Sequence, residues 1–64
     1  MNGVPVDTIQ FFRDALGDWR WRYYRSDGMA LADSAPGYAD RIECVAAAEY
    51  LFVRDGLSFV FEEN

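Results

Sequence analysis

The segment from Trp19 to Tyr23 constrains the fold more than any other part of the chain, because large aromatic side chains alternate with arginines there. Successive side chains of a β-strand point to opposite faces of the sheet. The alternation therefore predicts a strand with an aromatic face toward the core and a cationic face that needs a partner. The aromatic face consists of Trp19, Trp21 and Tyr23, and the cationic face of Arg20 and Arg22.

Alternating apolar residues, helical spacing and turn residues divide the chain into five elements. Strands are predicted over residues 8–13, 19–25, 29–32 and 57–61, and a helix from Arg41 to about Arg54. Gly17 marks the first hairpin loop, and Asp27-Gly28 is a strong turn signal for the second. The order β-β-β-α-β predicts an α+β domain: a three-stranded antiparallel meander, one helix packed on one face, and a C-terminal strand. The domain is expected over residues 8–61, between a loose lead-in over 1–7 and an acidic tail over 62–64.

The helix has a predicted start signal and a predicted buried stripe. Asp40 stands at the N-cap position, and Glu43 follows three residues later, as in a capping box. The apolar stripe at three- and four-residue spacing consists of Cys44, Ala47, Ala48, Leu51 and Phe52. The small or apolar run from Cys44 to Ala48 passes right round the helix, so the helix is either covered on two sides or carries exposed alanines. The complete predicted core is Ile9, Phe11, Trp19, Trp21, Tyr23, Cys44, Ala48, Leu51 and Phe52.

A chain of 64 residues with one cysteine and no histidine has few ways to stabilise a small core. At this size hydrophobic burial and the lost chain entropy nearly cancel, so small domains usually recruit a disulfide, a metal or a second subunit. One cysteine forms no intrachain disulfide, and a lone cysteine without histidine builds no structural zinc site. The chain is 52% hydrophobic and 17% aromatic, which is rich for so small a domain, so we expect a homodimer.

The charge balance disfavours two classes of partner. The net charge is −5, and all six basic residues are arginines. Because attraction to phosphate supplies most of the sequence-independent affinity for nucleic acid, a general nucleic-acid binder or an anionic-membrane binder is disfavoured. The sequence has no apolar run near the length of about 18 residues that a membrane span needs, and no basic, apolar leader. With the lone thiol, these features predict a cytoplasmic protein.

The sequence lacks the residue sets that carry enzyme chemistry. Cys44 has no histidine to act as a base, and its place on the apolar stripe predicts a core residue. The loop from Asp14 to Asp18 lacks the spacing of a calcium loop, and Ser34 has no histidine for a catalytic triad. A Gly-rich phosphate loop is also missing. We therefore expect a non-enzymatic protein with no cofactor and no metal.

The cationic strand face is the candidate interface or ligand site. It comprises Phe12, Arg20, Arg22, Tyr24 and Arg25. Arginines beside aromatics can hold phosphates and stack bases, so one interpretation is single-stranded nucleic-acid or nucleotide binding. A second is that the arginines pair with the chain's own carboxylates, since the sequence holds 11 Asp and Glu. We favour a third, a protein-interaction surface shared with a second subunit, because Tyr, Trp and Arg are enriched at interfaces.

Several motifs resemble the YegP-like family of small domains of unknown function. Within residues 9–54 they are Gly17–Tyr23 at the hairpin, Asp27-Gly28 at the turn, Leu31–Ser34 at the third strand and Gly37–Arg41 at the helix start. The resemblance implies a small α+β domain that dimerises or occurs as a tandem duplication, with no established activity. The chain departs from the family after the helix, where Arg54-Asp55-Gly56 stands in place of the usual Asn-Ala-Pro type of turn. Whether the last strand pairs within its subunit or across a dimer therefore stays open.

Overall fold

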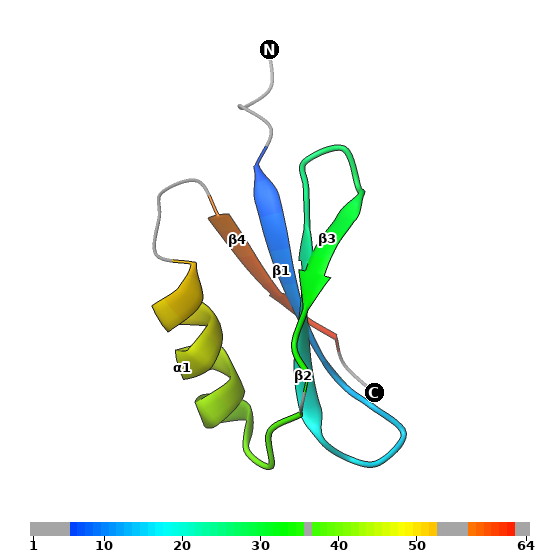
Figure 1. Cartoon of the computed structure of the whole chain (residues 1–64), viewed down its shortest axis with the longest axis vertical. Helices are drawn as coiled ribbons and strands as arrows, with labels where there is room; N and C mark the ends of the chain where they lie inside the picture. Colours follow the sequence, from blue (N-terminus) through cyan, green and yellow to red (C-terminus); the bar gives the residue numbers. More distant parts are fainter. Residues whose placement is uncertain (1–5, 36, 53–56, 63–64) are drawn as a thin grey trace.

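The computed structural model describes residues 6–35, 37–52 and 57–62. Its elements are β1 (Asp7–Arg13), β2 (Trp19–Tyr24), β3 (Ala30–Asp33), α1 (Arg41–Leu51) and β4 (Leu57–Phe61). Figure 1 shows one helix lying against one face of a sheet. The predicted α+β fold and its β-β-β-α-β order are therefore confirmed. Residues 1–5 of the predicted lead-in, the predicted helix positions 53 and 54, and residues 63 and 64 of the tail lie outside the described residues.

The sheet is mixed, with the strand order β3-β2-β1-β4. β1 pairs antiparallel with β2, so that Ile9 lies opposite Tyr23 and Phe11 opposite Trp21. β4 pairs parallel with β1, with Phe59 opposite Ile9. In the single chain, the last strand therefore pairs with the first strand of its own subunit. α1 supplies the crossover that a parallel neighbour requires.

Each of the two hairpin turns contains a glycine with a positive φ. Gly17 has a φ of +87° and Gly28 a φ of +95°, values that glycine adopts without the strain a side chain would add. β2 ends one residue earlier than predicted because Arg25 belongs to the turn, where its backbone N–H donates to the Met29 carbonyl at 2.8 Å. β3 is accordingly displaced by one residue, and a bulge leaves Leu31 without a paired residue on β2.

The core lies between α1 and the face of the sheet that carries the odd-numbered residues of β1 and β2. Its buried members are Ile9, Phe11, Trp21, Tyr23, Cys44 and Ala48. Around them pack the partly buried hydrophobics Trp19, Tyr38, Val45, Phe52, Leu57 and Phe59. Aromatic edges reinforce the packing, since Phe52 contacts both Trp21 and Tyr23 in edge-to-face geometry with ring centroids about 5 Å apart.

One predicted core residue is wrong: Leu51 is 56% exposed. The helix turns Cys44, Ala48 and Phe52 toward the sheet, and these residues are four positions apart. Leu51 lies about 100° from Phe52 around the helix, so it falls outside this stripe. Val45, which the predicted stripe left out, packs against the core in its place.

The predicted capping box is also wrong. Asp40 does occupy the N-cap, with an extended backbone at φ −115° and ψ 141°, but its side chain makes no cap hydrogen bond. The first helical contact comes from the backbone instead, because the Cys44 N–H donates to the Asp40 carbonyl at 3.1 Å. Asp40 and Glu43 are both exposed, and a reciprocal box would bring two carboxylates together.

Candidate interaction surfaces

The predicted cationic face is the face of the sheet opposite the one that packs against α1. Phe12 lies opposite Arg20 in the β1–β2 register, so both project from this face together with Arg22 and Tyr24. These four side chains are half-buried. Arg25 follows the end of β2 and is exposed in the turn. The structure thus brings four of the five predicted residues onto one surface and places the fifth at its border.

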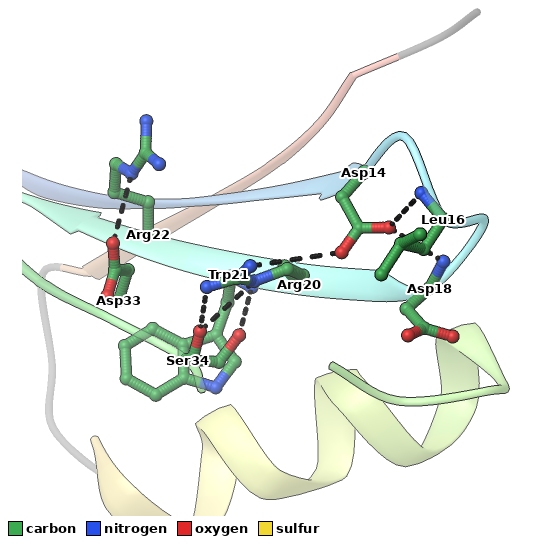
Figure 2. A network of polar contacts seen from close by, with 8 residues as sticks. All are labelled: Asp14, Leu16, Asp18, Arg20, Trp21, Arg22, Asp33 and Ser34. Atoms are coloured by element: carbon green, nitrogen blue, oxygen red, sulfur yellow. Dashed lines mark hydrogen bonds and ion pairs between the residues drawn. The ribbon is translucent and has the colours of Figure 1, made fainter. Parts of the chain in front are cut away.

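Arg20 is held by the end of β3. Its Nε and Nη2 both donate to the Ser34 carbonyl, at 3.1 and 2.5 Å, and its Nη1 lies 3.8 Å from Asp14 Oδ2 (Figure 2). Ser34 is itself buried, and its hydroxyl accepts from the Trp21 backbone N–H at 3.0 Å. Because the carbonyl and the hydroxyl of Ser34 both hold residues of β2 in this way, the role of this serine is structural.

Arg22 also has partners within the chain. Its Nε lies 3.7 Å from Asp33 Oδ2, and its guanidinium carbon lies 5.2 Å from the centre of the Phe12 ring. A hydrogen bond with Tyr24 and the nearby Asp33 carboxylate raise the pKa of Arg22, so it stays cationic. The side chain remains 40% exposed. Arg22 is the arginine of this face that retains most freedom to meet a partner.

Arg25 forms a two-pronged ion pair with Asp27, with Nε to Oδ1 at 3.1 Å and Nη2 to Oδ2 at 2.5 Å. The hydrogen bond from Arg25 lowers the pKa of the Asp27 carboxyl, and the Met29 N–H adds a second one at 3.1 Å. All three predicted arginines therefore pair with carboxylates of their own chain.

The residues considered for catalysis or metal binding have structural surroundings. Asp14 Oδ1 accepts from the backbone N–H groups of Leu16 and Asp18, which closes the first hairpin loop (Figure 2). Cys44 is fully buried, and this burial raises the pKa of its thiol to about 11. The thiol is thus neutral near pH 7 and shielded from solvent. Within the described residues, no group of three or more His, Cys, Asp or Glu side chains is placed to hold a metal ion.

Sequence reasoning missed a second surface, on the side of α1 that faces away from the sheet. Ile42 is 80% exposed and Tyr50 is 85% exposed, with exposed Ala46 between them. We call these three residues the outward row. Their spacing of four residues places them on one helix face and was available as a signal in the sequence. The continuous apolar run from Cys44 to Ala48 hid it, because that run contributes to both sides of the helix.

The edge strand β3 and Met29, which directly precedes it, form a third place where apolar side chains meet solvent. Met29 is 54% exposed and Leu31 is 53% exposed. β3 forms one end of the described sheet, so one side of its backbone pairs with β2 and the other faces away from the sheet.

Comparison with known proteins finds no matching family model, no matching curated protein and no matching solved structure. The resemblance to the YegP-like family therefore stays a prediction that rests on the motifs themselves. In the described part of the chain, helices fall short of the length and apolar character that crossing a membrane requires.

Proposed function

We propose that this chain is a non-enzymatic protein-interaction domain that acts as a homodimer. The observation that carries the proposal is the exposed apolar edge of the sheet at β3, formed by Leu31 together with Met29, which directly precedes the strand. An edge strand presents unpaired backbone N–H and C=O groups, which form a template for another strand. A second copy of β3 would satisfy them and continue the sheet across a two-fold axis.

The composition of β3 supports this use of the edge. Natural edge strands are commonly blocked by lysine, proline or inward-pointing charges. β3 reads Ala-Leu-Ala-Asp, and the single charge, Asp33, already pairs with Arg22. The small size of the domain and its surplus of apolar residues also favour association with a second subunit. A dimer also agrees with the resemblance to the YegP-like family, whose single-unit members dimerise.

Single-stranded nucleic-acid or nucleotide binding, the alternative interpretation, has less support. Arg20, Arg22 and Arg25 each have a carboxylate partner in the chain, so a phosphate would have to compete with it. The net charge of −5 opposes the approach of a polyanion. A cytoplasmic location belongs to our proposal as well, since the chain carries a single free thiol.

Sedimentation analysis of the purified protein at micromolar concentration tests the homodimer. We expect a dimer, and we expect Leu31→Lys to weaken it by about tenfold or more, equivalent to at least about 1.4 kcal/mol, because a charge replaces an apolar contact. Leu16→Lys is the matched control, since Leu16 is an equally apolar residue, 86% exposed, that lies away from β3 in the first hairpin loop. A folded wild-type monomer at these concentrations would refute the homodimer, and equal effects of the two variants would refute the β3 edge as its contact.

A further inference from the structure

We propose that the outward row of α1 is a docking site for a different protein partner, one that presents an amphipathic helix whose apolar stripe is flanked by Arg or Lys. The site is separate from the edge strand assigned to the homodimer. Ile42 and Tyr50 are 80% and 85% exposed, among the highest values for large apolar side chains in the described chain. Single exposed apolar residues need no explanation, but an aligned set on one rigid helix is typical of a recognition surface.

The helix is anchored in a way that leaves this row free. Cys44 and Ala48 on its opposite side are fully buried against the sheet, which fixes its rotation. The outward row therefore points away from the molecule's own core. Ala46 lies in the middle of the row, and a small residue there lets a partner helix approach the backbone closely while Ile42 and Tyr50 pack between its side chains. An aromatic residue such as Tyr50 is a common anchor of this kind.

The charges beside the row determine the chemistry of the partner. Glu43 and Glu49 are both exposed and lie on the two sides of the row. The helix has one basic residue, Arg41, and its guanidinium carbon lies 4.9 Å from the centre of the Phe61 ring, on the β4 side. The outward face is thus apolar in the middle and acidic at its margins. A basic rim on the partner complements it, because complementary charges accelerate and orient association.

The same charges argue against a second copy of this chain on this face. In an antiparallel pair about Ala46, the two Glu43 side chains would share one margin of the interface and the two Glu49 side chains the other. In a parallel pair, Glu43 of each copy would share a margin with Glu49 of the other. Both arrangements bring like charges together, which is destabilising at an interface. A heterologous partner with basic residues avoids this repulsion.

The test uses two synthetic amphipathic helical peptides with the same leucine pattern, one with lysine and one with glutamate at the polar positions. Each is labelled, and its binding to the full chain is followed by fluorescence anisotropy. We expect the lysine peptide to bind and the glutamate peptide to bind far more weakly. Ile42→Ser and Tyr50→Ser should each weaken lysine-peptide binding by about tenfold, as the loss of a central anchor does. Leu31→Ser is the matched control and should leave it unchanged.

Two further readouts distinguish a specific site from general charge attraction and from the homodimer contact. Reversing both charges, with Glu43→Lys and Glu49→Lys, should transfer the preference to the glutamate peptide. Lysine-peptide binding that neither serine variant weakens would reflect general attraction to an acidic protein and would overturn the proposal. Sedimentation of the same variants separates the row from the homodimer. If Ile42→Ser dissociates a dimer, the row belongs to a second copy and the inference fails, whereas a monomeric wild type that binds the peptide refutes the homodimer alone.

Discussion

At the residue scale, the role of each polar side chain depends on the partners that the fold places beside it. Arg20 and Arg22 are two positions apart on one strand and have the same predicted orientation. Arg20 donates twice to a backbone carbonyl and joins two strands, whereas Arg22 lies over an aromatic ring and stays 40% exposed. The alternation in the sequence predicts their shared face. It cannot predict this difference, because the partners Ser34 and Asp33 come from a later strand.

Position 37 requires glycine because its backbone lies close to Asp18 in the first hairpin. A Cβ at this position would lie 2.6 Å from the Cβ of Asp18, a separation that real side chains essentially never show. Trp19 and Tyr38, the residues that follow each of these two, exchange backbone hydrogen bonds of 2.7 and 2.8 Å, so neither segment can move away freely. We expect Gly37→Ala to lower the free energy of unfolding by about 1–3 kcal/mol, measured by urea denaturation.

The control for Gly37 removes the other atom of the clash. Combining Gly37→Ala with Asp18→Gly deletes the Asp18 Cβ and should recover part of the loss relative to the two single changes. Combining it with Asp18→Ala keeps that Cβ and removes only the contacts to Cγ and Oδ2 at 3.3 Å, so it should recover less. Equal results from the two pairs would show that crowding at this contact is not the cause.

Cys44 makes stability depend on pH in the alkaline range. Burial raises the pKa of its folded-state thiol to about 11. Below about pH 9 the thiol is neutral in both states, and above it the unfolded chain releases the proton while the folded chain retains it. The thiol therefore does not lower the free energy of unfolding below about pH 9. As the pH rises toward 11, this free energy falls by on the order of 2 kcal/mol. The measurement is urea denaturation across this range.

The wild type must be compared with Cys44→Ala, so that the effect of pH on stability that does not come from this thiol cancels. That variant has a different stability at every pH because it loses buried volume, but it lacks the thiol titration. We expect a shallower fall in its stability between about pH 9 and 11. Parallel curves for the two proteins would contradict a buried neutral thiol.

At the scale of the elements, the sequence predicts the existence of each helix, strand and turn more reliably than the rotation of the helix about its own axis. Period-two alternation identified four strands, and Gly17 and Gly28 identified the turns, because these patterns follow from local backbone geometry. The rotation of α1 depended on which residues the sheet could accept. Phe52 fits against Trp21 and Tyr23, so the stripe follows Phe52 and leaves Leu51 in solvent.

The start of α1 gives a prediction at this scale. A side-chain cap usually contributes about 1 kcal/mol, but Asp40 makes no cap hydrogen bond. Its remaining contribution is the attraction between its carboxylate and the helix dipole, about 0.5 kcal/mol. Asp40→Ala should therefore cost no more than this in urea denaturation, and 1 M salt should reduce the effect by screening, where the Debye length is about 3 Å. A salt-independent loss of the usual capping size would instead indicate a formed cap.

At the scale of the whole molecule, the α+β class and the element order could be derived from the sequence, but the neighbour of β4 could not. Alternation in Leu57–Phe61 predicts a strand without naming the strand beside it. The position beside β1 follows from the core, because Phe59 and Phe61 both contact Phe11 there. The candidate surfaces show the same limit. The cationic face was predicted from one strand, whereas the apolar edge at β3 depends on the order of the strands.

Because β1 and β4 pair in parallel, the resistance of the sheet to a pulling force depends on where the force is applied. A pulling force applied at residues 6 and 62 would draw these two strands past each other along their length. Every pair from Asp7 and Leu57 to Phe11 and Phe61 would then bear the load at once. A force applied across the open end of the β1–β2 hairpin, at Thr8 and Tyr24, would instead open its antiparallel pairs one after another. The sheet is therefore built to withstand tension along its central strand better than tension that peels its strands apart.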